Sequence, residues 1–494
     1  MVSPFLLLGA LSAVVGHNAL LANPVWTDEL DYWRAVFSWL HMGGGVGYSG
    51  IGEHAALLGT LSVHGLSPLL LYGWFAALFG WSFSSIVLVN CLWVAAGALT
   101  FSLLNRPRGA VAAWMAVAMV AYAPVVLYVA TSMTELANYG LLLFYLAFLL
   151  KLDGARRKAR NAQGVAPGAV GLGWVILCGL TVILCCAYRI TYLGLFIPLL
   201  AVACDYRWSG RLLVGALAAL LLSAFVYYLT ALTASPFTSG FLYNFLRAGS
   251  PEMALRMFLS HAKANLLDYF IRPTSNLMET LQRWLYTGVM ILTLAGAFVR
   301  AEKGERGDRV RFRPDGLFLM SFVMLFLPFA IVVSAYETND WSDYRTLAPF
   351  LWLVVAGQLI RGRKLVPAAF LAGCAAILLA LSTGAPVGAF SDAERFQARP
   401  FSADTQALCA AIEYDAQADT PFDNTVRTDL FTLETVATLH PGIGIETGWF
   451  TEDTVGKSRW VLTDHLKIPL EGYGLVLRNR SGSVYRRLDA DEKP

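Results

Sequence analysis

Charged residues are scarce in this sequence. Only 14% of the 494 residues are Asp, Glu, Lys or Arg, whereas 57% are hydrophobic, and the mean hydropathy is +0.56. A soluble globular protein typically has about a quarter charged residues. The composition therefore excludes an ordinary soluble protein and predicts a multi-spanning integral membrane protein.

Pairs of cysteines are lacking as well. Six of the seven cysteines lie within apolar runs, where a thiol behaves as a small hydrophobic group. Cys409 lies in the polar C-terminal region, which has no second cysteine. We therefore expect no disulfide framework, and since the sequence has no CxxC motif and no Cys/His cluster, it suggests no metal site.

Two further features are missing. The apolar run from Val2 to about Leu21 has neither a preceding basic segment nor a small-x-small cleavage site. We therefore interpret it as an uncleaved first span rather than a signal peptide. We also find no internal repeat, and so no indication of the inverted symmetry that is common in transporters.

Long apolar runs are the main feature that is present. Together with the first run, about eleven stretches have membrane-crossing length. The others are residues 83–104, 109–129, 132–150, 171–187, 189–204, 212–233, 285–300, 315–335, 346–360 and 365–385. The stretch 171–204 is too long for one helix, so we divide it at the polar Tyr188-Arg189 step.

Clusters of Lys and Arg follow every second span. They are Arg106 with Arg108, residues 151–160, Arg207 with Arg211, residues 300–313 and residues 361–364. If the spans alternate, all these clusters lie on one side, and the excess of basic residues in cytoplasmic loops identifies that side as the cytoplasm. Counting the apolar stretch Leu66–Phe79 as a further span would reverse this pattern, so we expect an interfacial or re-entrant helix there.

Three segments then lie on the outer face, at about residues 23–82, 235–284 and 387–494. The last one predicts a helix over 405–416, strands over 425–427, 459–462, 473–477 and 484–486, and a hairpin turn over 480–483. The predicted fold is thus an all-α polytopic membrane domain over residues 1–386, with interfacial helices in its first outer loop. A small C-terminal α/β periplasmic domain over residues 387–494 follows it.

Three carboxylates are crowded at the start of the first outer loop, in the segment Trp26-Thr27-Asp28-Glu29-Leu30-Asp31-Tyr32. Mutual repulsion among Asp28, Glu29 and Asp31 favours proton uptake, which suits a general base or a cation ligand. The alternative is that Asp28 caps a helix whose first turn Asp31 completes.

Three candidate residues lie further along the chain, each with a simpler alternative. His64, just before the interfacial helix, is a candidate ligand of a phosphate or of an acceptor hydroxyl, or an ordinary interfacial residue. Glu135, at the outer end of the fourth span, is a functional candidate, or the third residue of a capping box begun by Thr131 or Ser132. Arg189 interrupts an apolar stretch and needs an anion, unless it reaches the interface by snorkelling.

The remaining cations lie in two outer loops. Arg345 follows Asp340 and Asp343, and would either bind a phosphate bidentately or pair with one of these carboxylates. The second outer loop carries Arg247, Arg256, Lys263, Arg272 and Arg283. Basic residues are normally in excess in cytoplasmic loops, whereas these five lie in a predicted outer loop. We therefore interpret them as contacts of an anionic ligand or lipid headgroup.

The order of these features resembles the C superfamily of glycosyltransferases, which includes protein O-mannosyltransferases and aminoarabinose transferases. The resemblance is carried by Asp28-Glu29 with Tyr32, the His64-led apolar helix, Ser132 with Glu135, and Asp343-Tyr344-Arg345 with Pro349. His64 departs from the family's His-x-Pro-Pro-like pattern, since its proline comes four residues later and has no second proline beside it.

The resemblance implies an inverting enzyme that moves a sugar from a polyprenyl-phosphate donor to an acceptor on the outer face. By its motif, Asp28 would be the catalytic base and Glu29 its neighbour, which supports it or binds a divalent cation. Tyr32, His64 and Glu135 would contribute to substrate binding. Arg189 and Arg345 have no firm counterpart in the family, and we expect them only as candidates for binding the donor phosphate.

Two other classes of protein remain open. An O-antigen polymerase or ligase would leave the Asp28-Glu29 loop unexplained, and a transporter of polyprenyl-linked glycans would show midplane charges and repeats. The expected partners are the lipid-linked donor, a glycan, lipid or protein acceptor and membrane lipid, but no nucleic acid. A bacterial inner membrane is the expected location, with the site and the C-terminal domain on the periplasmic side.

Overall fold

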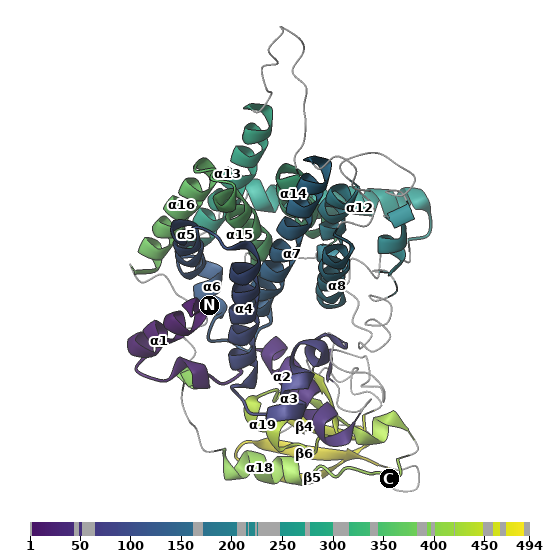
Figure 1. Cartoon of the computed structure of the whole chain (residues 1–494). Helices are drawn as coiled ribbons and strands as arrows, with labels where there is room; N and C mark the ends of the chain where they lie inside the picture. The colour runs from purple at the N-terminus through teal and green to yellow at the C-terminus, as the bar shows by residue number, and fades with distance from the viewer. Residues whose placement is uncertain are drawn as a thin grey trace.

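The computed structural model consists of a bundle of helices and a small mixed sheet at one end of it (Figure 1). The described residues are 2–43, 49–51, 65–161, 171–204, 214–215, 217–222, 225, 248–271, 277–299, 316–335, 344–382, 393–396, 401–418, 420–447, 458–464 and 471–488. The predicted combination of a mostly helical body with a small C-terminal α/β part is confirmed.

The bundle follows the predicted apolar runs closely. Its helices are α1 (Ser3–Val15), α4 (Ser85–Asn105), α5 (Gly109–Val120), α6 (Ala123–Tyr128), α7 (Glu135–Asn161), α8 (Leu172–Tyr188), η3 (Ile190–Leu195), α9 (Phe196–Ala203), α13 (Leu277–Val299), α14 (Gly316–Ala335), α15 (Tyr344–Ile360) and α16 (Leu365–Ser382). The predicted division at Tyr188-Arg189 is confirmed, because α8 ends at Tyr188 and Arg189 has an extended backbone. Most of the predicted span 212–233 lies outside the described residues.

Two predicted spans differ from the structure. The first helix has 13 residues rather than about twenty, because it ends at Gly16, whose φ of 72° is left-handed. At 1.5 Å per residue it is about 20 Å long, short of a hydrocarbon core of about 30 Å. The second is the run 109–129, which breaks between α5 and α6 just before Pro124.

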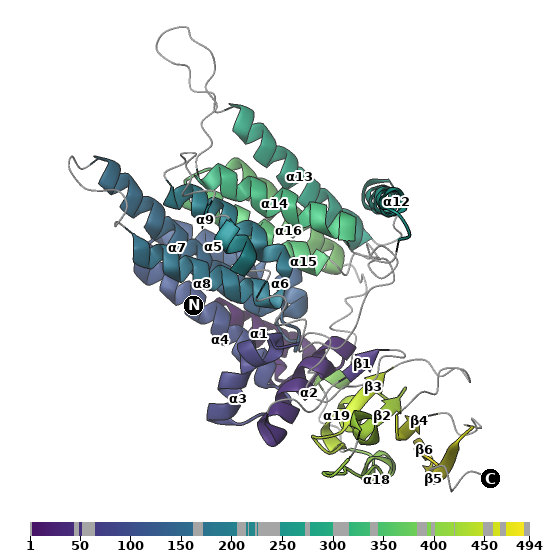
Figure 2. The same ribbon diagram turned by 90° about the vertical axis from the view of Figure 1, so that its right-hand side faces the viewer.

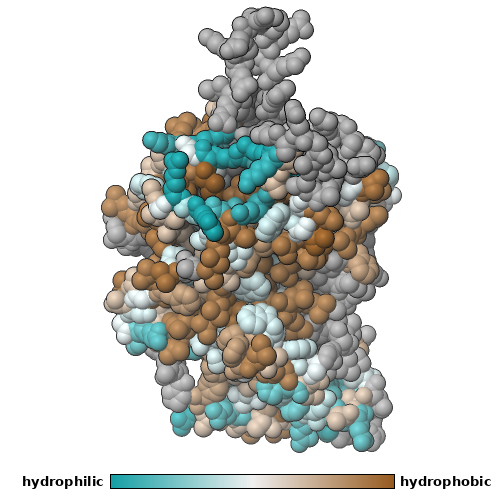
Figure 3. All heavy atoms as spheres, in the orientation of Figure 1, coloured by the Kyte–Doolittle hydropathy of each residue, from teal (hydrophilic) through white to brown (hydrophobic). Residues whose placement is uncertain are grey.

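Within the described residues, two helices are long and apolar enough to cross a membrane, Ser85–Asn105 and Glu135–Ala159. Eight further apolar helices are 10–17 residues long. The two long helices, α4 and α7, pack closely because glycines face each other: a Cβ atom on Gly140 would lie 2.5 Å from the backbone of Trp93. Figure 3 shows an apolar surface over the middle of the molecule, with hydrophilic residues above and below it.

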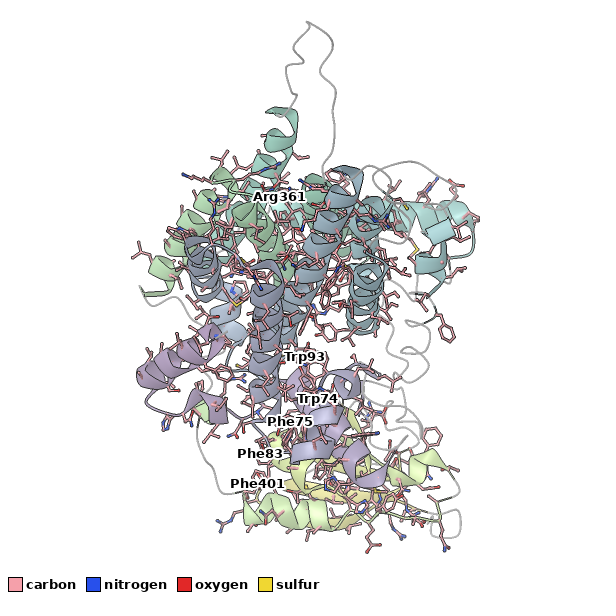
Figure 4. All side chains as sticks on the ribbon, in the orientation of Figure 1. Trp74, Phe75, Phe83, Trp93, Arg361 and Phe401 are labelled. Carbon is pink, nitrogen blue, oxygen red and sulfur yellow. The ribbon has the colours of Figure 1, made fainter. Side chains whose placement is uncertain are left out.

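The ends of the helices that carry basic residues lie together, far from the sheet. Arg361, after α15, pairs with Asp153 of α7 at 2.8 Å, and Arg157 pairs with the same carboxylate at 3.0 Å. Arg361 lies at the opposite end of the molecule from Phe83 and Phe401 (Figure 4). Two of the basic clusters predicted to share one side of the protein therefore share one end of the bundle.

The sheet has six strands in the order β1-β3-β2-β4-β6-β5. The first four are parallel to their neighbours, and β6 pairs antiparallel with β4 and β5. They are β1 (Ser49–Ile51), β2 (Thr425–Thr428), β3 (Gly444–Thr447), β4 (Trp460–Thr463), β5 (Tyr473–Asn479) and β6 (Gly482–Arg487). Around them lie η5 (Ala393–Phe396), α18 (Ala403–Ala410), η6 (Pro421–Asn424) and α19 (Leu433–Thr438).

The four strands predicted from the C-terminal sequence are confirmed, as is the hairpin turn between β5 and β6. The predicted helix 405–416 is shorter, because α18 ends at Ala410. Strands β1 and β3 were not predicted. Strand β1, at the edge, comes from the predicted first outer loop and pairs with β3 through Ser49 and Ile445. The sheet is thus built from segments that are almost four hundred residues apart in the chain.

Helix α2 (Thr27–Met42) lies between the bundle and the sheet (Figures 1 and 2). It contacts the interfacial segment that was predicted near Leu66–Phe79, which forms η2 (Leu69–Gly73) and α3 (Trp74–Phe79). The indole of Trp33 donates to Ser82 O at 3.0 Å, and the indole of Trp81 donates back to Trp33 O at 3.1 Å. Figure 4 shows Phe83 and Phe401 in this same region, where the helical body meets the sheet.

A further helix, α12 (Pro251–Phe270), lies in the predicted second outer loop, where the sequence did not predict one. It is set apart from the bundle and is seen end-on in Figure 2. Its contact with the bundle is made near the end of α14, where the amide of Asn265 donates to Val333 O at 2.8 Å.

Candidate active site

The first turn of α2 is held by Glu29. One carboxylate oxygen accepts hydrogen bonds from the backbone N–H groups of Val25 (2.9 Å) and Trp26 (2.8 Å). The other accepts from the backbone N–H of Ser132 (2.5 Å) and from Nη1 of Arg395 (2.7 Å). A carboxylate has about four lone-pair sites, so these four donors occupy the acceptor capacity of Glu29.

Asp28 does not cap this helix, contrary to the simpler interpretation of the sequence. Trp26 occupies the N-cap position, and Glu29 is the acidic residue that accepts hydrogen bonds from the N-terminal backbone. Asp28 is half-buried in the first turn, one residue before the fully buried Glu29. The two neighbouring carboxylates therefore have different surroundings: Glu29 is built into the fold, and Asp28 lies at its edge.

Tyr32 connects Asp28 with the start of α7 and the end of α8. It is buried one turn after Asp28. The pKa of its phenol is raised well above the ordinary value, first by burial and then by the neighbouring acidic groups of Tyr188, Asp28 and Glu135, whereas Arg189 lowers it. Asp28, Tyr32, Glu135 and Arg189, which the sequence identified separately, thus lie in one region of the structure.

Glu135 and Arg189 form an ion pair between α7 and the end of α8. The distance from Nη2 of Arg189 to Oε1 of Glu135 is 2.9 Å, and the side chains are 16% and 2% exposed. Glu135 is the first residue of α7, not the third, so the capping-box interpretation is wrong. The anion that Arg189 needs is therefore present within the protein, as the buried carboxylate of Glu135.

A second buried tyrosine lies beside this ion pair. The hydroxyl of Tyr72 in η2 donates to Oδ1 of Asn90 at 2.9 Å, and the amide of Asn90 donates to Met133 O at 2.6 Å. Burial is the main reason that the pKa of Tyr72 is raised, and Tyr188 and Glu135 raise it further. The interfacial segment, α4 and the start of α7 are therefore joined at the site.

Arg395 is a site residue that was not predicted from the sequence. This residue of η5 is fully buried, pairs with Glu29 and lies over the ring of Trp26 at 4.8 Å. Its segment reads as an ordinary charged loop, Asp392-Ala393-Glu394-Arg395, and nothing in the local pattern indicates a buried cation. The role of Arg395 becomes clear only from its ion pair with the buried carboxylate of Glu29.

A second buried arginine ties α2 to the sheet. The guanidinium of Arg34 donates to the backbone carbonyls of Val436, Leu439, His440 and Ile443 at 2.6–3.0 Å. These carbonyls lie at and after the C-terminus of α19, where the helix dipole favours a cation. Burial lowers the pKa of Arg34 to about 9, which indicates how fully this cation is removed from water.

Two predicted site residues have no described side chain. His64 lies outside the described residues, as does the loop that precedes Arg345. Arg345 itself is the second residue of α15, but its side chain is not among those described. Within the described part of the chain, no group of three or more His, Cys, Asp or Glu residues could hold a metal ion.

No family model matches the sequence, and no curated protein matches it. Among solved structures, the chain is similar to ArnT from Cupriavidus metallidurans bound to undecaprenyl phosphate. The TM-score is 0.40, the identity is 15%, and all of both chains is covered. It is also similar to ArnT from the same organism in the apo state, with a TM-score of 0.39, 16% identity and coverage of 99% of this chain and 98% of the other.

Proposed function

We propose that this protein is a polyprenyl-phosphate-sugar-dependent glycosyltransferase that acts at the membrane surface. The observation that carries the proposal is the gathering of Asp28, Tyr32 and the Glu135–Arg189 pair beside an apolar bundle. A lipid-linked sugar needs such a place, because its tail requires an apolar surface while its sugar and phosphate require polar groups.

Asp28 is the proposed general base. The hydroxyl of the acceptor attacks the anomeric carbon, its proton passes to the Asp28 carboxylate, and the bond from the anomeric carbon to the phosphate oxygen breaks. The configuration of the sugar is inverted, and the lipid phosphate leaves. Glu29 is not suited to take the proton, because four protein donors already occupy its oxygens.

The leaving phosphate gains negative charge and needs cations. Arg189, held by Glu135, and Arg345, at the start of α15, are the proposed contacts. His64 keeps its proposed role toward the phosphate or the acceptor hydroxyl. A divalent cation is a further candidate for charge stabilisation, although its ligands would have to be other than the occupied oxygens of Glu29.

The proposed orientation has the site and the sheet on the periplasmic side of a bacterial inner membrane. It is supported by the basic residues around Asp153 and Arg361, which lie at the opposite end from Phe401 (Figure 4). About eleven spans within residues 1–386 and a soluble domain over residues 387–494 complete the proposal. The acceptor is a glycan, a lipid or a protein.

The test is transfer of labelled sugar from polyprenyl-phosphate donors by the purified full-length protein in lipid nanodiscs. We expect Asp28→Asn to lower the transfer rate by about 10²–10⁴-fold, the usual contribution of a general base, and to leave donor binding intact. Glu413→Gln is the control, since Glu413 is an exposed acid in the C-terminal part. An Asp28→Asn protein as active as the wild type would remove the assignment.

A further inference from the structure

Five buried side chains around the start of α7 have polar atoms without a hydrogen-bond partner within the described structure. They are Ser132, Thr134 and Thr191 through their hydroxyls, Tyr139 through its phenol, and Asn138 through both amide atoms. Each of these residues is at most 2% exposed. Because buried polar groups are nearly always paired in native proteins, such a concentration indicates a partner that comes from outside the chain.

Three of the unpaired groups, those of Thr134, Asn138 and Thr191, lie between α7 and η3, whereas the ring of Tyr139 packs against Tyr122 and Trp352. Thr134 and Asn138 are one turn apart, and Tyr145 continues the same stripe two turns later. The hydroxyl of Tyr145 donates to Leu195 O of η3 at 2.9 Å, so this stripe faces η3. Thr191 lies at the start of η3, beside the Arg189 that pairs with Glu135. Figure 2 shows α7 and α8, which leads into η3, running side by side.

The chemistry of this group of side chains is neutral. Hydroxyl and amide groups both donate and accept hydrogen bonds, and the charge of Glu135 is compensated by Arg189 at 2.9 Å. A phosphate would require uncompensated positive charge, whereas a sugar ring presents several hydroxyls that donate and accept in the same way. The unpaired groups therefore match a sugar better than a phosphate.

We propose that Thr134, Asn138 and Thr191 form the subsite for the sugar of the lipid-linked donor. This inference rests on the proposed function and assigns these three residues to the sugar part of the donor. The sugar is bound between α7 and η3, next to Asp28 and Tyr32, and the phosphate bonded to it lies toward Arg189 and Arg345, the cations proposed above. The unpaired groups gain their partners from the hydroxyls of the sugar.

The test separates sugar recognition from lipid-phosphate recognition. Wild-type protein in nanodiscs is first titrated with a panel of polyprenyl-phosphate hexoses and pentoses and with sugar-free polyprenyl phosphate. Asn138→Leu, Thr134→Val and Thr191→Val are then compared with the best donor and with the sugar-free lipid. We expect donor binding to weaken about ten-fold or more in each variant and binding of the sugar-free lipid to change less than two-fold.

Thermal stability provides the second readout. Each variant removes an unpaired buried polar atom, so its melting temperature should equal or exceed that of the wild type, while donor binding falls. Thr134→Ser and Thr191→Ser keep the hydroxyl and should keep donor binding. Thr181→Val is the control, since the hydroxyl of Thr181 already donates within α8, to Leu177 O at 2.8 Å.

The outcomes are distinguishable. Variants that bind the donor as the wild type does would refute the sugar subsite and would indicate that only water fills it. Equal losses for the donor and for the sugar-free lipid would refute it in favour of phosphate binding. Failure of the wild type to bind any lipid-linked sugar would instead refute the proposed function itself.

Discussion

The ion pair between Glu29 and Arg395 is the clearest target for mutagenesis. Both side chains are fully buried, and their charged atoms are 2.7 Å apart. Replacing Arg395 with Met keeps the length and apolar contacts of the side chain and removes the charge. Glu29 then remains buried with only the three backbone donors Val25, Trp26 and Ser132.

The expected cost of this change is large. Removing one partner of a buried ion pair typically costs about 3–5 kcal/mol, because the other charge is left without compensation. Arg395 also lies 4.8 Å from the centre of the Trp26 ring, an interaction that a desolvated cation strengthens. The double variant Glu29→Gln/Arg395→Met should lose less unfolding free energy than the sum of the losses in the two single variants. We expect a coupling energy of about 2–3 kcal/mol.

Hydrogen exchange measures this cost locally. The backbone N–H groups of Trp26 and Ser132 donate to Glu29, so their exchange reports the opening of the first turn of α2. A loss of 3–5 kcal/mol corresponds to exchange that is about 150-fold to 5,000-fold faster. Peptides that cover residues 24–30 and 130–136 would be followed by mass spectrometry in the full-length protein.

An exposed ion pair is the matched control. Arg256 and Glu252 on α12 are 2.6 Å apart, but their side chains are 79% and 73% exposed. Arg256→Met should change exchange very little, because exposed pairs contribute little to stability. Exchange less than ten-fold faster in Arg395→Met, or additive effects in the double variant, would show that this pair does not hold α2 in place.

Two further predictions concern packing and pH. Gly140→Ala places a Cβ atom 2.5 Å from the Trp93 backbone, so it should lower the melting temperature and cost about 1–3 kcal/mol or more of folding free energy. The control is Gly173→Ala on α8, where the added Cβ atom meets open space. Equal melting temperatures for the two variants would refute the close contact between α4 and α7. The pKa of His440 is lowered by partial burial and by the charge of Arg34, and its Nδ1 accepts from Gly442 N at 3.1 Å. The unfolded chain therefore takes up this proton first, and stability should be constant above about pH 6.5 and fall as the pH drops through the folded pKa. An Asn side chain at position 440 still offers a hydrogen-bond acceptor but does not titrate. Between pH 7.5 and 5.5, the melting temperature of His440→Asn should therefore fall less than that of the wild type. Equal decreases in the two proteins would contradict this prediction.

The helices and strands were predictable because their signals are local. Apolar runs bounded by polar residues predicted most of the bundle, and Arg189 ends α8 where a charged residue interrupts such a run. Alternating patterns predicted four strands of the sheet. Strands β1 and β3 were not predicted, since strands of three and four residues gain their stability from pairing with their neighbours and leave almost no trace in their own sequences.

Part of the proposed site was predictable from the sequence, but the contacts among its residues were not. The sequence identified Asp28, Glu29, Glu135 and Arg189 by residue type and position. It did not reveal that Glu135 and Arg189 pair with each other, since they are 54 residues apart. Nor did it reveal Arg395, because the burial of a charge depends on a partner that local patterns do not encode.

Asp28 and Glu29 differ in burial and in hydrogen bonding because α2 is fixed to the rest of the protein through Glu29. Its first turn is fixed through Glu29 to the backbone before α7 and to Arg395, and its second turn is fixed through Arg34 to the carbonyls after α19. The helical body thus holds α2 through the backbone of Ser132, and the C-terminal part of the chain holds it through two buried arginine contacts. A reacting group must be kept within a fraction of an ångström of its productive position. In the proposed mechanism Asp28 is such a group, and its support lies beside it, because the neighbouring Glu29 carboxylate fixes the first turn of α2.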